Sequence, residues 1–275
     1  MPVEDRTGKT AAPPVPDWGL VGAVQGRLPD RGPRYAETPA DPYAATAPAI
    51  AEPYNTVTAT LFVVIVFYWV IRLRGRYSRF PFLVSCLPIL FVGGIGGTLY
   101  HAFRTRQVYF FLDVLPISFL GLAGAIYLTI RLGKWHGWRR VGVYGLGAIV
   151  AYLAVNLFVF RLVHFERLPN LPVNLSYASL AAVVLIPLFG VLIATKFRWA
   201  GYVWAGLACF AIGFFCRLVD RTPYGDLPMG THWLWHLFGA ACTQFLIAYF
   251  YRLEGERADL LAESGPSKKT GKESP

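Results

Sequence analysis

Charged residues are scarce in this sequence. Asp, Glu, Lys and Arg make up only 15% of its 275 residues, whereas hydrophobic residues make up 55%. This composition, together with a mean hydropathy of +0.44, excludes an ordinary soluble domain and is typical of a chain that lies in lipid.

Cysteines and targeting signals are scarce too. The four cysteines, Cys86, Cys209, Cys216 and Cys242, all fall inside apolar segments. This placement excludes a disulfide framework in loops, so we interpret the cysteines as small buried packing residues. The first residues, MPVEDRTGKT, lack the apolar core and cleavage site of a signal peptide. We therefore expect the first hydrophobic segment to direct membrane insertion itself.

Long hydrophobic runs are what the sequence has instead. About 20 apolar residues suffice to carry a helix across roughly 30 Å of hydrocarbon. Such runs lie at about 55–73, 81–101, 108–130, 140–163, 172–195, 200–219 and 232–251. They are continuous, whereas the strands of a β-barrel alternate apolar and polar residues. The prediction is an all-α fold, an integral membrane bundle of seven transmembrane helices.

This bundle occupies residues 51–252 in the prediction. Residues 1–50 are rich in Pro, Gly and Ala and are predicted to form an irregular extramembrane segment. The tail, residues 253–275, is polar and charged and is predicted to be disordered.

The net charge of +10 is best explained by orientation in the membrane, because the basic residues stand at the ends of the hydrophobic runs. We predict no nucleic-acid partner. The loops after the first, third and fifth runs carry more Lys and Arg than the loops at the other face. The positive-inside rule then places the N-terminus outside and the C-terminus in the cytoplasm.

A few polar side chains lie in or beside these runs, where each costs a few kcal/mol without a partner. They are Glu52, Asn55, His101, Asp113, Arg217, Asp220, His232 and His236. Because successive helices alternate direction, all of these positions meet at one membrane face, the one away from the cytoplasm. Transport is therefore the least favoured function, since a transported ion needs polar residues through the full depth.

Three histidines in this layer predict a metal site. His232 and His236 are one helical turn apart, so both rings project from one face of a helix. Alone, such a pair is more often a helix cap or a partner of backbone carbonyls. His101, at the same depth, completes a set of three neutral nitrogen ligands, with which zinc keeps a fourth position open for water. Asp113 is then a general base, a group that orients a ligand or water by hydrogen bonding, or the partner in a salt bridge to Arg217 or another helix.

Three stretches together resemble the alkaline ceramidase family of seven-helix membrane hydrolases. They are IAEPYNTVTATLF at 50–62, GGIGGTLYHAF through FLDVLPIS at 93–118, and FCRLVDRTPYGDLPMGTHWLWHLFG at 215–239. The last stretch is the most specific and is similar to bacterial members in particular. The resemblance covers most of the chain after residue 50.

The resemblance implies a zinc-dependent amidase that cleaves ceramide into a sphingoid base and a fatty acid. The zinc ligands would be His101, His232 and His236, and Asp113 the catalytic aspartate, one residue further from His101 than the family pattern. Where the family usually has serine, four residues before the first histidine, this chain has Gly97. Thr98 beside it is the candidate to steady the oxyanion.

The resemblance also suggests a calcium site before the first helix. Its candidate ligands are Glu52, Asp41 and Glu37, whose oxygens suit a hard cation.

The leading hypothesis is therefore a hydrolase of ceramide or a related N-acyl lipid in a bacterial plasma membrane. The alternative is a non-catalytic seven-helix receptor or scaffold with a structural zinc site.

Overall fold

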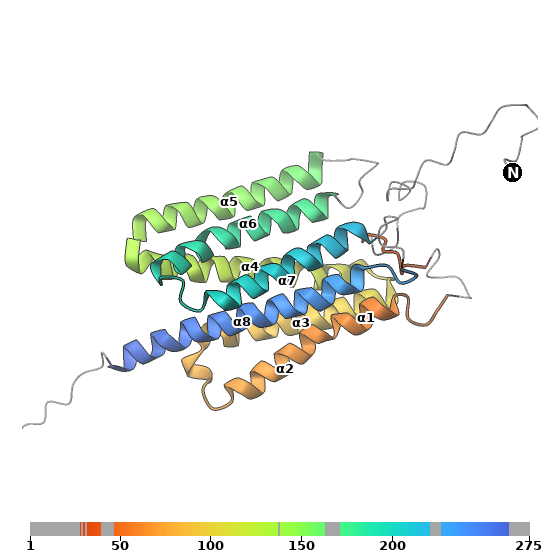
Figure 1. Ribbon diagram of the computed structural model, residues 1–275. Coiled ribbons are helices and arrows are strands. Elements are labelled where there is room, and N and C mark those ends of the chain that lie inside the picture. The colour runs from red at the N-terminus through yellow and green to blue at the C-terminus, as the bar shows by residue number, and fades with distance from the viewer. Residues whose placement is uncertain are drawn as a thin grey trace, which may run out of the picture.

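The computed structural model describes residues 28, 30, 32–39, 47–136, 138–162, 171–220 and 227–263. Every regular element in these ranges is a helix, as predicted (Figure 1). The helices are α1 (Pro53–Ala59), α2 (Leu61–Leu73), α3 (Pro81–Phe103), α4 (Gln107–His136), α5 (Trp138–Leu162), α6 (Leu171–Ala194), α7 (Ala200–Val219) and α8 (His232–Glu263), with a short 3-10 turn, η2 (Tyr77–Arg79). In the described part of residues 1–50 the chain forms turns and bends.

The helices lie side by side in a bundle (Figure 1). α8 packs along α7, α3 packs along α4, and α4 also contacts α5 and α6. The starts of α1 and α8 lie at the same end of the bundle, and the described residues 32–39 lie at that end too (Figure 1). The predicted polar layer lies at this end.

Within the described residues, five helical segments are long and apolar enough to cross a membrane. They are Pro53–Leu73, Pro81–Phe103, Gln107–Gly133, Val173–Ala194 and Ala200–Val219. Many of their large apolar side chains face outward; Ile71 is 72% exposed and Ile186 is 70% exposed. Water would penalise such a surface, whereas lipid accommodates it, so the chain has the features of a multi-pass membrane protein.

The first predicted helix is interrupted at Thr60, which separates α1 from α2. The hydroxyl groups of Thr58 and Thr60 donate to the carbonyls of Tyr54 and Val57, at 2.8 and 2.6 Å. Threonines that bond the preceding turn in this way bend helices. Both helices still form one span of 21 residues.

The glycine run at residues 93–97 brings α3 close to its neighbours. A Cβ atom at Gly96 would lie 2.5 Å from backbone atoms of Leu112 in α4. A Cβ atom at Gly94 would lie 2.9 Å from the side chain of Val63 in α2. The run therefore lets α3 pack tightly between two helices, as small residues do in membranes.

The predicted disorder of the tail from residue 253 is wrong for its first part, because α8 continues to Glu263. Leu253 is fully buried. The Glu254 carboxylate accepts hydrogen bonds from the backbone N–H groups of Phe82 and Leu83 at 2.8 and 3.2 Å. These groups belong to the first turn of α3 and have no partner within their own helix. This capping contact, invisible in the polar sequence of the tail, explains its order.

Candidate metal centre

The three predicted histidines come together. His101 lies in the last turn of α3, and His232 and His236 lie in the first two turns of α8. All three are buried, and one possible ligand atom from each lies within 4.8 Å of the others. The ring centroids are 4.7 Å apart for His101 and His236 and 4.9 Å apart for His232 and His236. Within the described residues, this is the group able to hold a metal ion.

One nitrogen on each ring has no hydrogen-bond partner. These atoms are Nε2 of His101, Nδ1 of His232 and Nε2 of His236. A buried polar atom without a partner costs about 1–3 kcal/mol, so three together are expensive. A metal ion would satisfy all three at once, because neutral imidazole nitrogens are its ligands. The observed donor set thus fits a metal ion, and the structure favours this interpretation over separate helix caps.

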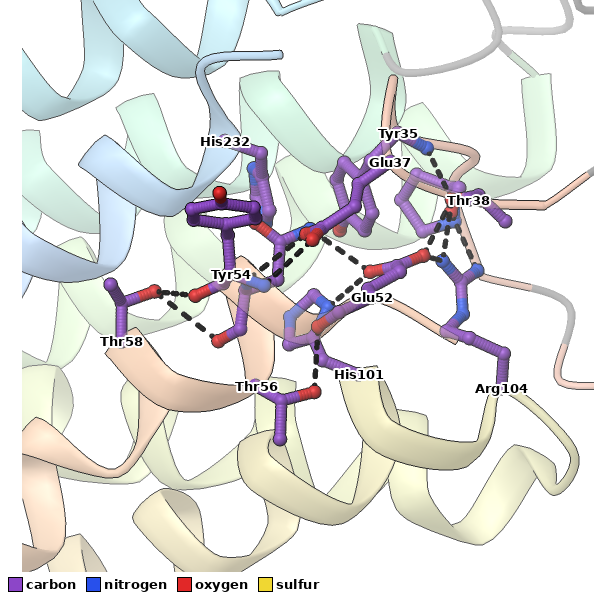
Figure 2. Close-up of polar contacts among 12 residues, drawn as sticks. Tyr35, Glu37, Thr38, Glu52, Tyr54, Thr56, Thr58, His101, Arg104 and His232 are labelled. Carbon is purple, nitrogen blue, oxygen red and sulfur yellow. Dashed lines mark hydrogen bonds and ion pairs between the residues drawn. The ribbon is translucent and has the colours of Figure 1, made fainter. Parts of the chain in front are cut away.

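Glu52 fixes the ring of His101. Its Oε2 atom lies 2.6 Å from Nδ1 of His101, the ring nitrogen opposite the unpartnered one (Figure 2). The backbone N–H of Glu52 also donates to the carbonyl of His101 at 3.1 Å. Carboxylates in this position orient metal-binding histidines and raise their basicity. The sequence suggests Glu52 as a calcium ligand, and in the structure its carboxylate lies behind the candidate metal centre.

Arg104 holds the other side of the same carboxylate. Its guanidinium is completely buried and forms ion pairs with Asp30 and, as Figure 2 shows, with Glu52. Burial raises the pKa of Glu52, but Arg104 and His101 outweigh it and bring the value down to about 2. Glu52 is therefore an anion at any physiological pH. Sequence analysis missed this role of Arg104, because a basic residue after an apolar run signals only orientation.

Tyr35 covers the face of His232. The two rings stack with their centroids 3.7 Å apart and an interplanar angle of 14°. Burial raises the pKa of Tyr35 to about 12, although nearby Arg217 and Arg104 oppose the increase. Tyr35 lies in the Pro- and Gly-rich segment, where no periodic pattern marks any residue as important, so its role was not predictable from the sequence.

Asp220 anchors the start of α8. Its Oδ1 atom accepts hydrogen bonds from the backbone N–H groups of Thr231 and His232, both at 2.7 Å. Its Oδ2 atom accepts another from Ala36 at 2.9 Å. Burial raises the pKa of Asp220, and these three donors oppose that rise. The carboxylate joins the end of α7, the start of α8 and the N-terminal segment beside His232.

Asp113, in α4, lies against Gly97, which stands one helical turn before His101 in α3. A Cβ atom at Gly97 would lie 2.7 Å from Oδ1 of Asp113. Among the described residues Asp113 forms no hydrogen bond or ion pair, so the alternative of an ion pair with Arg217 is not observed. Arg217 instead donates to Oδ1 of Asn174 at 3.1 Å. Asp113 is half-buried.

Thr98 has a local partner. Its hydroxyl donates to the carbonyl of Gly94 within α3 at 2.7 Å. The proton that an oxyanion would need is therefore committed to the helix, and the geometry gives the predicted role of Thr98 no support.

Two of the predicted calcium ligands, Glu37 and Glu52, lie in the described residues, and each has protein partners. Glu37 accepts hydrogen bonds from the backbone N–H groups of Tyr54 and Asn55, at 2.6 and 3.0 Å (Figure 2). Glu52 is held by Arg104 and His101. Asp41 lies outside the described residues. Glu37 therefore acts as a cap for α1, and Glu52 as the support of a histidine.

Comparison of the chain with protein-family models and with curated proteins finds no match. The chemical interpretation thus depends on the site itself: three converging imidazoles, an anion behind one of them, and a free carboxyl group nearby.

Proposed function

We propose that this protein is a zinc-dependent membrane amidase that hydrolyses the N-acyl bond of ceramide or a related lipid. The observation that carries this proposal is the convergence of three unpartnered histidine nitrogens in a buried layer at one end of an apolar bundle. Three protein ligands leave a position open for substrate or water, as in catalytic zinc sites. The resemblance of the three sequence stretches to alkaline ceramidases supports the same substrate class.

Zinc in such a site supplies a Lewis acid for the carbonyl oxygen and an activated water as nucleophile. In this proposal Asp113 accepts a proton from the attacking water and transfers it to the nitrogen as the carbon–nitrogen bond breaks. The products are a free fatty acid and an amine. Glu52 orients His101, and Asp220 fixes the start of the helix that carries His232 and His236.

The proposal places the bundle in a bacterial plasma membrane with seven crossings. α5 and α8 join the five spans above, since α5 contains an apolar stretch at Gly145–Phe158 and α8 has 32 residues. The metal centre and the N-terminus then face away from the cytoplasm, in agreement with the distribution of Lys and Arg.

The alternative, a receptor or scaffold with a structural metal, makes a different prediction for the site. Structural zinc sites are usually closed by four protein ligands. The described residues provide three, His101, His232 and His236.

The test combines metal analysis with hydrolysis. The protein purified in detergent is analysed for bound metal and incubated with ceramides and other N-acyl lipids, and released fatty acid is measured. We expect close to one zinc per chain, activity that a strong chelator removes and zinc restores, and loss of both metal and activity in His232→Ala. Asp113→Asn should keep the metal and lose at least 100-fold in activity, the usual range for a general base.

Thr98→Val is the matched control, because its hydroxyl bonds only the helix carbonyl in the structure and its loss should leave hydrolysis within a few-fold of wild type. Retained hydrolysis after complete metal removal would refute the mechanism. Stoichiometric zinc without release of fatty acid from any N-acyl lipid would favour the scaffold.

A further inference from the structure

Arg104 occupies a cage of oxygen atoms. Its guanidinium bonds Oδ2 of Asp30 at 2.7 Å, the carbonyl of Pro33 at 2.7 Å and Oγ1 of Thr38 at 3.1 Å. It also pairs with Oε1 of Glu52. The rings of Tyr100 and Tyr35 cover it, with centroids 4.5 and 5.5 Å from its central carbon. The charge is thus fully enclosed by protein.

The backbone at this position indicates that the side chain has a specific task. Arg104 ends α3 in the left-handed conformation, with φ 52° and ψ 28°. Glycine is the usual residue at such a helix end, because a side chain makes this conformation unfavourable. An arginine in this conformation has an unfavourable backbone energy, and the ion pairs of its side chain within the cage offset that energy.

The cage has the chemistry of a calcium site but does not fit calcium. Two carboxylates, a carbonyl and a hydroxyl are hard oxygen ligands of the kind that calcium takes. In this chain the same oxygens already bond a guanidinium, which cannot lose its proton. A calcium ion in the cage would stand beside a buried positive charge that repels it.

The cage is connected to two of the three histidines. Glu52 spans the distance between Arg104 and His101, with one oxygen on each (Figure 2). The segment that supplies Asp30, Pro33 and Thr38 also carries Tyr35, which stacks on His232. Loss of the guanidinium would therefore loosen the support behind one ligand and the cover over another.

We propose that Arg104 is a built-in cation in a cage of calcium-type oxygen ligands, and that it positions His101 and His232 through Glu52 and the N-terminal segment. This inference rests on the metal centre of the proposed function but not on its substrate. It makes the centre independent of calcium in the wild-type protein. It also predicts that removing the guanidinium, which leaves Asp30 and Glu52 without their partner, creates a response to calcium.

The test uses Co²⁺ in place of zinc, because its visible absorption reports the geometry of its ligands. Co²⁺ affinity, the Co²⁺ spectrum and Tm are measured in metal-depleted buffer with and without Ca²⁺. Wild type should bind Co²⁺ with the same affinity and spectrum under both conditions. Arg104→Gln should bind it about 10–100-fold more weakly, the usual effect of losing the support of a ligand, and Ca²⁺ should recover part of that loss. Exposed Arg106, two residues further on, provides the control: Arg106→Gln should behave as wild type.

A second variant covers the case in which Arg104→Gln does not fold. Asp30→Asn keeps Arg104 paired with Glu52 while loosening the N-terminal segment, and it should weaken Co²⁺ binding several-fold without a response to Ca²⁺. Unchanged Co²⁺ affinity in Arg104→Gln or Asp30→Asn overturns the inference, as does a wild-type spectrum or affinity that depends on Ca²⁺. A wild type that binds no Co²⁺ overturns the metal centre itself and the proposed function with it.

Discussion

Asp220 provides the sharpest test of how the fold builds the metal centre. Its carboxylate accepts three backbone hydrogen bonds, from Ala36, Thr231 and His232. Asp220→Ala removes all three, whereas Asp220→Asn keeps one oxygen and so retains either the two bonds at the start of α8 or the one to Ala36. The side-chain volume hardly changes in the asparagine variant, so the comparison isolates charge and hydrogen bonding.

The expected magnitudes follow from these contacts. A hydrogen bond to a charged group contributes about 1.5–3 kcal/mol, and a negative charge at a helix start up to about 2 kcal/mol. Because the contributions overlap, we expect Asp220→Ala to lose about 3–5 kcal/mol of stability and Asp220→Asn about 1–3 kcal/mol. His232 sits on the first residue of α8, so the loss of this cap should also weaken metal binding about 10–100-fold.

The assay is thermal unfolding in detergent, followed by tryptophan fluorescence, combined with competition for metal against a coloured chelator. Glu256→Gln is the control. This partly exposed carboxylate lies near the opposite end of α8 from His232 and pairs with Arg131 and Arg198. It should change stability by less than about 1 kcal/mol. If Asp220→Ala matched Glu256→Gln in both Tm and metal affinity, the Asp220 carboxylate would not be what holds the start of α8 and its histidines in place.

Three further predictions concern the rest of the bundle. Gly97→Ser should lower activity rather than increase it, because the added Cβ atom would lie 2.7 Å from Oδ1 of Asp113. Fatty acid release measures the effect, and Gly97→Ala, which places the same Cβ atom there, is the variant for comparison. Glu254→Gln should lower Tm and reduce the free energy of unfolding by about 1–2 kcal/mol, because it weakens the cap of α3. The Glu256→Gln variant, two residues further on, again serves as control. Metal removal should lower Tm and zinc should restore it, with about 4 kcal/mol of stabilisation when free zinc exceeds its Kd 1,000-fold; an unchanged Tm would contradict a metal held in the folded state.

Much of the site was predictable from local rules. Apolar runs of membrane length located the helices to within a few residues, except for the extension of α8. The alternation of helix direction then placed His101, His232 and His236 at one end of the bundle, where the structure has them. Burial makes a lone histidine costly, so three at the same depth already indicated a shared partner.

Other roles were not predictable, because they depend on contacts between distant parts of the chain. Nothing in the turn-forming sequence around Tyr35 shows that its ring lies on His232. The polar tail gave no sign that Glu254 closes the start of α3. A basic residue at the end of a hydrophobic run signals orientation, and only the fold surrounds Arg104 with carboxylates.

The sequence by itself determined that the chain is helical, that it suits lipid, and that its histidines share one depth, because hydrophobicity and helical period are local properties. The tertiary structure alone decided which side chains support those histidines. Glu52 and Asp220 act on residues 49 and 12 positions away in the chain, respectively. Such partners depend on how the helices pack and on where the irregular segments contact them. No local sequence pattern encodes either.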